Sequence, residues 1–314
     1  MKPLVIIAGP TAVGKSELAV LLSKRINGEV VSADSMQVYK GMDIGSAKIT
    51  PAEMDGVKHH LIDVLEPTED FNVALFQKLS SDACEDIIKR GKIPVLCGGT
   101  GFYIQALLYG IDFNESTGEL SDYRKSLEKE AAENGPDGLY EELLRVDPES
   151  SEIIHKNNVK RVIRALEFYH ETGRPISSHN TEQHSNPPVY DSCFFVLNDD
   201  REKIYDKINA RVDKMLSMGL VDEVKALKEQ GLTRNNISMQ GLGYKEILDY
   251  LDGKCTLDDA VEIIKRDSRH FAKRQITWFK REKNVIWLNR YDFDNDSEKL
   301  LEFMLNVLKL KGII

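Results

Sequence analysis

The stretch LVIIAGPTAVGKSELAVLLSKRI, residues 4–26, joins an apolar run, a glycine-rich turn and a segment with helical periodicity. Its centre, GPTAVGKS at residues 9–16, satisfies the pattern G-x-x-x-x-G-K-[ST] of phosphate-binding loops. The glycines let the backbone curl so that its N–H groups point inward, and the following helix adds its positive N-terminal end. Lys15 supplies a charge and Ser16 a hydroxyl that can bind Mg²⁺. The expected phosphate-binding residues are Gly9, Pro10, Thr11, Ala12, Val13, Gly14, Lys15 and Ser16, with Ser16 as the Mg²⁺ ligand.

Four more apolar runs end at polar or glycine-rich turns, as the first one does. They read EVVSADS from Glu29, IPVLCGGTG from Ile93, CFFVLND from Cys193 and NVIWLN from Asn284. Helical patterns such as VALFQKLSSDACEDIIKRG fill most of the gaps between these runs. Continuous apolar strands that alternate with helices are typical of a parallel sheet covered on both faces. We therefore predict an α/β fold, a P-loop NTPase-like parallel sheet core flanked by helices.

A long polar stretch between the third and fourth predicted strands contains helical patterns and no strand candidate. Its clearest segments read YRKSLEKEAAEN, GLYEELLRV and NVKRVIRALEFYHETG, and SHNTEQHSNPPVY follows them as a polar return. We predict a helical insertion at residues 113–190. The P-loop core with its C-terminal helices then comprises residues 1–112 and 191–314.

The whole chain has 314 residues, 41% of them apolar, and a formal net charge of −9, so a polyanionic partner needs a local basic patch. No apolar run approaches the roughly 20 residues that span a bilayer, and the N-terminus lacks a signal-peptide pattern. The four cysteines are scattered without a CxxC pair, which argues against a zinc module and a disulfide scaffold. We expect a cytoplasmic monomer without a membrane partner.

Ligands of a parallel α/β sheet bind beyond the carboxyl ends of its strands, so residues that follow the second and third strands should face the phosphate loop. Asp34, Ser35, Met36 and Gln37 follow EVVSA, and Thr100 lies among the glycines that follow IPVLC. Asp34 offers a carboxylate and Thr100 a hydroxyl. The simpler alternatives are a helix cap or a Mg²⁺-water ligand for Asp34, and a plain strand-to-helix turn for Thr100.

Two basic stretches stand out from the acidic average. Lys160, Arg161 and Arg164 lie within about one helical turn, and residues 265–283 contain eight Lys or Arg against two Asp or Glu, a local charge of +6. Such stretches can bind several phosphates of a nucleic acid. The simpler alternative is a solvated helix face.

Eight blocks, in this order, resemble the tRNA dimethylallyltransferase family, and they extend from residue 9 to about residue 282. They read GPTAVGKSELA, VVSADSMQVYKGMDIGSAK, HHLIDV, GKIPVLCGGTGFYIQALLYG, NVKRVIRALEFYHETGRPIS, INARVDKMLSMGLVDEV, MQGLGYKEI and FAKRQITWFKRE. No zinc-finger segment follows the last predicted strand, so the resemblance is to the short bacterial form. Lys156 stands where a proline is expected, and Gly241 where the family often has alanine.

The resemblance implies that the bound phosphate is the diphosphate of dimethylallyl diphosphate, and that it is a leaving group. The dimethylallyl group goes to N6 of the adenosine 3′ to the anticodon, so the partner is a tRNA anticodon stem-loop, the cofactor is Mg²⁺ and ATP is not needed. The implied catalytic residues are Asp34, Thr100, Arg211 and Lys15. The implied tRNA-binding residues are Asp34, Ser35, Met36, Gln37, Thr100, Lys160, Arg161, Val162, Ile163 and Arg164.

Asp34 is the expected general base, because the exocyclic amine must lose a proton as it attacks carbon. The same carboxylate could serve the metal instead, and the sequence leaves both roles open. His59 and His60 suggest a metal site, which we reject because adjacent histidines do not readily share one tetrahedral ion. We expect them in a polar loop.

Three other functions share features of this sequence. A P-loop kinase for a small metabolite shares the core and the phosphate loop, and predicts ATP consumption without RNA. An isopentenyltransferase that acts on free adenine nucleotides would have no use for the basic helices and the insertion. A non-enzymatic RNA-binding module would leave Lys15, Asp34 and Thr100 without a role.

Overall fold

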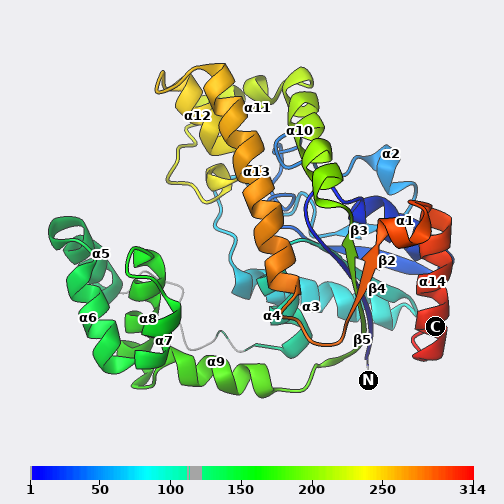
Figure 1. Cartoon of the computed structure of the whole chain (residues 1–314), viewed down its shortest axis with the longest axis horizontal. Helices are drawn as coiled ribbons and strands as arrows, with labels where there is room; N and C mark the ends of the chain where they lie inside the picture. The colour runs from blue at the N-terminus through cyan, green and yellow to red at the C-terminus, as the bar shows by residue number, and fades with distance from the viewer. Residues whose placement is uncertain (1, 112, 114–121) are drawn as a thin grey trace. The chain divides into compact units, whose positions relative to one another are not determined.

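The computed structural model describes residues 2–111, 113 and 122–314 (Figure 1). The chain forms two compact units. One comprises Met1–Leu108 and Val189–Ile314, and the other comprises Tyr109–Pro188. Each unit has a hydrophobic core of its own. Among the described residues, no helix is long and apolar enough to cross a membrane.

The first unit is built on one parallel sheet, which confirms the predicted fold class. In the described part of the chain its strands are β1 (Lys2–Ala8), β2 (Gly28–Ala33), β3 (His59–His60), β4 (Ile93–Gly98), β5 (Tyr190–Asn198) and β6 (Val285–Asn289), in the order β3-β2-β4-β1-β5-β6. The central strand β1 pairs with β4 on one side and with β5 on the other, so that Ile7 lies opposite both Cys97 and Phe195. The carboxyl end of β1 therefore lies between two other strand ends.

Strand β3 is a structural element that the sequence prediction missed, because a loop was expected at His59 and His60. These residues pair with Val30 and Val31 at the edge of the sheet. Two polar residues are too short a run to show alternation, so the pattern gave no sign of a strand. His60 Nε2 lies 2.8 Å from Glu29 Oε2, a hydrogen-bonding contact that also fixes this edge.

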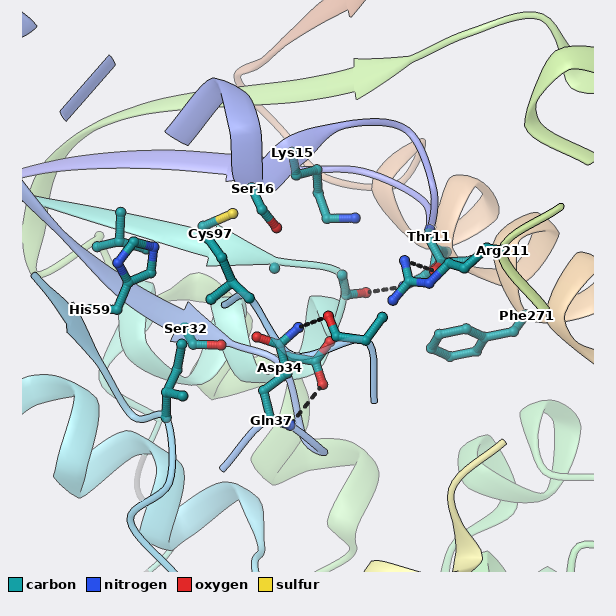
Figure 2. A pocket seen from close by; sticks show the side chains of 17 residues that line it. Thr11, Lys15, Ser16, Ser32, Asp34, Gln37, His59, Cys97, Arg211 and Phe271 are labelled. Carbon is teal, nitrogen blue, oxygen red and sulfur yellow. Dashed lines mark hydrogen bonds between the residues drawn. The ribbon is translucent and has the colours of Figure 1, made fainter. Parts of the chain in front are cut away.

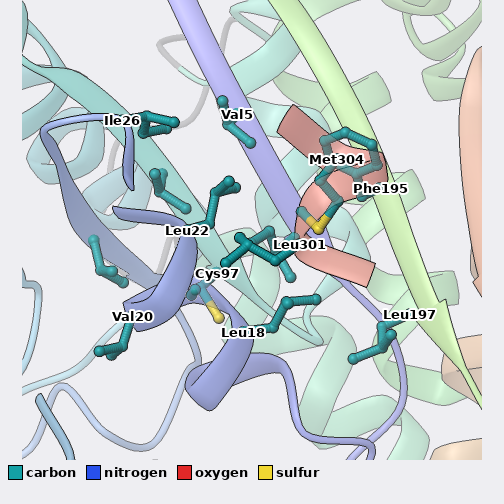
Figure 3. Packing of buried hydrophobic residues seen from close by; sticks show 14 of the residues in the cluster. Val5, Leu18, Val20, Leu22, Ile26, Cys97, Phe195, Leu197, Leu301 and Met304 are labelled. Carbon is teal, nitrogen blue, oxygen red and sulfur yellow. The ribbon is translucent and has the colours of Figure 1, made fainter. Parts of the chain in front are cut away.

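Helices cover both faces of the sheet. The described helices of this unit are α1 (Lys15–Arg25), α2 (Pro51–Met54), α3 (Val73–Lys89), α4 (Gly101–Tyr109), α10 (Arg201–Ser217), α11 (Leu220–Glu229), α12 (Tyr244–Leu251), α13 (Leu257–Phe279) and α14 (Ser297–Leu310), with short 3₁₀ turns at Ser238–Gln240 and Arg290–Phe293. Helices α1 and α14 pack on one face, where Leu22 and Met304 meet Val5 and Phe195 (Figure 3). Phe194 points to the opposite face and packs edge to face on Phe279 at the end of α13.

The second unit is helical in its described part and consists of α5 (Asp122–Asn134), α6 (Asp137–Val146), α7 (Pro148–Ile153), α8 (Val159–Thr172) and α9 (Ile176–Ser185). Leu127, Leu143 and Leu166, from three different helices, lie in its core. The buried carboxylate of Asp147 accepts hydrogen bonds from the Ser150 and Ser177 backbone N–H groups, and so joins the first turns of α7 and α9. These contacts stabilise the described, helical part of this unit.

Candidate active site

A pocket lies at the carboxyl ends of β1, β2 and β4, where the sequence places its polar strand ends (Figure 2). Its polar lining includes Thr11, Lys15, Ser16, Asp34, Gln37 and Arg211. Its apolar lining includes Val30, Ile49, Ile62, Cys97 and Phe271. The pocket therefore combines a cationic part with an apolar part, and all its lining residues belong to the sheet unit.

The phosphate-binding loop has a backbone that requires glycine. Gly9 has a φ of 144° and Gly14 a φ of 95°, both in the region that favours glycine. A Cβ atom on Gly9 would lie 2.3 Å from the Leu197 carbonyl oxygen, so β5 approaches the loop too closely for a side chain. Helix α1 begins at Lys15, directly after the loop, and its free N–H groups therefore point toward the pocket.

Lys15 is a cation that the loop holds in a desolvated position. Its Nζ donates a hydrogen bond to the Pro10 carbonyl oxygen at 2.6 Å. Burial of the ammonium group lowers the pKa of Lys15 to about 8, and the neighbouring Arg211 charge acts in the same direction. An anion bound in the loop would restore a fully charged ammonium.

Arg211 reaches the pocket from α10, some 200 residues away in the sequence. Its guanidinium donates to Thr11 Oγ1 at 3.4 Å (Figure 2). It also donates to the Ser46 carbonyl oxygen at 3.5 Å. Both acceptors are neutral and both distances lie at the long end of hydrogen bonding. Burial lowers the pKa of Arg211 from its usual value. Its charge is thus available to an anion between the loop and α10.

Asp34 follows β2, and its carboxylate both shapes a turn and lines the pocket. Its Oδ1 accepts hydrogen bonds from the backbone N–H groups of Met36 at 2.8 Å and Gln37 at 3.4 Å, which shapes the turn after the strand. Its carboxylate also lines the pocket with Lys15 and Arg211. The carboxylate is therefore oriented by the turn, as a group that must meet a substrate needs to be.

Ser35, Met36 and Thr100 are not among the residues that line this pocket in the described structure. Thr100 precedes α4, and its carbonyl oxygen accepts the Tyr103 and Ile104 N–H groups. Met36 lies against Gly241, where a Cβ atom would be 2.5 Å from Met36 Cε. The glycine at position 241 thus makes room for the Met36 side chain.

The predicted basic stretch of residues 160–164 lies in the helical unit, on α8. Lys160 and Arg161 are exposed, whereas Val162 and Ile163 are buried in the helical core at 1% and 3% exposure. Arg164 donates to Glu167 Oε2 at 3.3 Å. The side chains of Val162 and Ile163 therefore pack in the helical core. Any RNA contact made by this stretch would come from its basic residues.

The basic stretch of residues 265–283 lies mostly on α13. Lys265 pairs with Asp213 and Arg266 with Asp267, so part of the local charge is neutralised within the unit. Lys273 and Arg274 are exposed, as are Lys280, Arg281 and Lys283 beyond the helix end. The free positive charge is thus concentrated in the second half of the stretch.

Sequence reasoning missed three residues that lie at the pocket or at its phosphate loop. Gln275 on α13 bonds to the phosphate loop, Arg290 Nη1 donates to the Val13 carbonyl oxygen at 3.1 Å, and His59 lines the pocket. The sequence shows Gln275 only as an uncharged residue within a basic helix, and its burial against the loop becomes visible in the fold. The sequence around Arg290 gives no sign of its contact with the loop.

The donor set of the pocket fits Mg²⁺ if a bound diphosphate supplies further oxygens. Among the described residues, no group of three or more His, Cys, Asp or Glu could hold a metal ion. Ser16 and Asp34 line one pocket and offer a hydroxyl and a carboxylate oxygen. Mg²⁺ commonly binds one or two such protein oxygens together with phosphate oxygens and water.

Comparison with known proteins gives consistent results. The sequence profile of the family described as IPP transferase matches residues 37–282, and that described as isopentenyl transferase matches residues 2–70. A tRNA dimethylallyltransferase from Lachnoclostridium phytofermentans is 55% identical over 314 residues, which cover 100% of both chains. One from Acetivibrio thermocellus is 50% identical over 313 residues, covering 100% of this chain and 99% of the relative.

Solved structures show the same similarity in three dimensions. A full-length tRNA isopentenylpyrophosphate transferase from Bacillus halodurans has a TM-score of 0.74 and 44% identity, and the match covers 99% of this chain and 98% of that one. A eukaryotic dimethylallyltransferase described as acting on tRNA has a TM-score of 0.80 and 33% identity, with coverage of 92% and 74%.

Proposed function

The chain belongs to the tRNA dimethylallyltransferase family, and on this premise we propose that its pocket transfers the dimethylallyl group of dimethylallyl diphosphate to N6 of the adenosine 3′ to the anticodon in tRNA. One observation carries the proposal. A single pocket is lined by the cations Lys15 and Arg211, by the apolar side chains Val30, Ile49 and Ile62, and by the carboxylate of Asp34. A prenyl diphosphate needs these two environments.

The leaving diphosphate acquires negative charge as the allylic C–O bond breaks. Fixed donors and cations placed where this charge grows lower the barrier. Lys15 and Arg211 are the cations that line the pocket, and the start of α1 adds its N–H groups. We assign Ser16 as the residue that would hold Mg²⁺, which supplies further positive charge to the diphosphate when bound.

The N6 amine of adenine attacks C1 of the allyl group while the C–O bond electrons leave with diphosphate. The new N–C bond requires the nitrogen to lose a proton. We assign this proton to the carboxylate of Asp34, whose Oδ1 is already oriented by the Met36 N–H group. We place the allyl group against the apolar lining residues Val30, Ile49 and Ile62, where it would be shielded from water.

The target adenosine must leave its stack to reach a pocket between strand ends, which costs least in a single-stranded loop. We propose Ser35, Met36, Gln37 and Thr100 as its neighbours. The exposed Lys160 and Arg161, with Arg164, are the proposed phosphate contacts of the helical unit. We further propose that the protein is cytoplasmic and monomeric.

The proposal is tested with the purified protein, Mg²⁺ and labelled dimethylallyl diphosphate, offered tRNA, AMP, or a small metabolite together with ATP. We expect label on tRNA and release of diphosphate, without ATP consumption. Label on AMP in place of tRNA would favour the free-nucleotide enzyme. Phosphorylation of the metabolite would favour a kinase, a function that finds no support among the relatives.

The role of Asp34 is tested by Asp34→Asn, because the amide oxygen can still accept the Met36 N–H bond. We expect single-turnover transfer to fall by about 10²- to 10⁴-fold, with diphosphate binding retained. A variant that transfers normally would remove the base role, and one that loses Mg²⁺-dependent diphosphate binding would assign Asp34 to the metal.

A further inference from the structure

Gln275 connects two loops of the pocket that come from different parts of the chain. Its Oε1 accepts a hydrogen bond from the backbone N–H of Thr11 at 2.9 Å, and its Nε2 donates to the Gly99 carbonyl oxygen at 3.0 Å. The side chain is 7% exposed and lines the pocket. It comes from α13, more than 170 residues beyond either loop.

The space for this side chain is built into the β4 turn. A Cβ atom on Gly99 would lie 2.1 Å from Gln275 Nε2, and 3.3 Å from the Gly9 carbonyl oxygen. Glycine at position 99 therefore lets the two loops approach with the amide between them. A primary amide is the group that donates and accepts at once without carrying a charge, and Gln alone combines it with this side-chain length.

The contact also decides which loop amides remain for a ligand. A backbone N–H has one proton to donate, and that of Thr11 is directed at Gln275 Oε1. The amides that follow Thr11, Lys15 and the start of α1 remain for phosphate oxygens. The backbone donors for diphosphate then begin at Ala12, three residues after Gly9, the first residue of the sequence motif.

We propose that Gln275 is a positioning residue of the transfer reaction, one that fixes the spacing between the phosphate loop and the β4 turn through Thr11 and Gly99. The inference rests on the proposed function, since it concerns the same pocket. Its effect is to hold the diphosphate donors and the Gly98–Gly99 backbone in one arrangement before substrates bind. Preorganisation of this kind favours the transition state more than the free substrate.

The test is the pair Gln275→Glu and Gln275→Met, with transfer to tRNA measured from pH 6 to 8.5. An ionised Glu still accepts from Thr11 but faces the Gly99 carbonyl with a second acceptor, whereas a protonated Glu can donate to it. We expect kcat/KM of Gln275→Glu to be at least about tenfold below wild type at pH 8.5, and to recover toward wild type as the pH falls. Dividing kcat/KM of the variant by that of the wild type at each pH cancels the titration of Lys15, which both proteins share.

Gln275→Met fills the same space but makes neither hydrogen bond. Because Met carries no charge, this variant distinguishes a loss of the loop spacing from charge repulsion. We expect a deficit that does not change with pH and that falls on kcat more than on the KM for the prenyl diphosphate. Gln230→Glu, on an exposed residue at the end of α11, is the matched control for the charge change and should behave as wild type at every pH.

Three results would overturn the inference. They are a Gln275→Met variant with wild-type kcat, a Gln275→Glu deficit that is constant with pH, and recovery at low pH in the Gln230→Glu control. If Gln275→Glu does not fold, the inference is tested with Gln275→Met alone. Its kcat is measured as before, and its binding of inorganic diphosphate is measured by calorimetry. Failure of the proposed function itself is distinguishable, because the wild-type protein would then transfer no label to tRNA.

Discussion

Lys15 donates to Pro10 within its own loop, and this contact must give way or be shared when diphosphate enters. The free protein has a Lys15 pKa of about 8 because the ammonium group is desolvated. Bound diphosphate favours the charged form and raises this pKa, so binding takes up a proton wherever the free residue is uncharged. The uncharged fraction of Lys15 is therefore larger at pH 8.5 than at pH 7.

We therefore predict that diphosphate binding takes up more protons at pH 8.5 than at pH 7. Calorimetry in buffers with different ionisation enthalpies measures it directly. Lys15→Arg is the control, since its guanidinium stays charged over this range and should abolish the uptake. Uptake that is equal at both pH values would assign the proton to another group.

Gly9 and Gly91 form a natural pair for testing how β5 shapes the loop. Both have positive φ, but a Cβ atom on Gly9 would meet the Leu197 carbonyl oxygen at 2.3 Å, whereas nothing lies within 4 Å of one on Gly91. We predict that Gly91→Ala lowers the free energy of unfolding by roughly 1–2 kcal/mol and leaves diphosphate affinity unchanged. Gly9→Ala should lower stability further and weaken diphosphate binding at least tenfold, as measured by chemical denaturation and calorimetry.

Helix α11 holds the loop that follows β2 through one carboxylate. Glu223 accepts hydrogen bonds from the backbone N–H groups of Asp43, Ile44 and Gly45 at 2.7 to 3.0 Å, and from Tyr244 Oη at 2.8 Å. The same loop presents Ala47 and Ile49 to the pocket and its Ser46 carbonyl to Arg211. Glu223 thus sets the position of one pocket wall from outside.

We predict that Glu223→Gln raises the KM for dimethylallyl diphosphate by about tenfold, because the loss of charge weakens three charge-assisted hydrogen bonds and loosens the wall. The change should be smaller in the KM for tRNA. Asp222→Asn alters the neighbouring, exposed carboxylate of the same helix and should leave both KM values unchanged. Equal effects of the two variants would show that α11 acts through its charge alone.

The sequence predicted the strands whose signal lies in a short run of neighbouring apolar residues. Each of the apolar runs from Leu4, Glu29, Ile93, Cys193 and Asn284 forms a strand of the sheet. The two-residue β3 was missed, since its pairing with Val30 and Val31 leaves no periodic trace. The phosphate loop and Asp34 could be placed near each other by the rule for strand ends. Gln275 could not, because its role depends on a contact with Thr11 across 264 positions.

At the scale of the whole molecule, the chain carries a net charge of −9 and still has to meet a polyanion. The exposed basic residues of α8 belong to the helical unit, whereas every residue that lines the pocket belongs to the sheet unit. We therefore expect binding of RNA phosphates by α8 and binding of the prenyl diphosphate by the pocket to depend on different residues.

We predict that the double variant Arg161→Ala/Arg164→Ala raises the tRNA Kd and reduces the slope of log Kd against log salt by roughly 1.5 to 2, as expected for two lost phosphate contacts. Dimethylallyl diphosphate affinity should not change. Lys125→Gln/Lys129→Gln on α5 removes the same charge from exposed positions of the same unit. A salt slope that falls equally in this control would count against α8 as the contact.

The position of β1 between β4 and β5 has a consequence for biosynthesis. Residues 109–188 are translated after β4 and before β5, an interval of roughly 4 to 16 seconds at ordinary elongation rates. Throughout that interval the nascent β1 has one apolar edge without a neighbour, which is a template for aggregation. Ribosome-bound chains that end before residue 190 should therefore recruit chaperones, and release of those chaperones should coincide with emergence of β5.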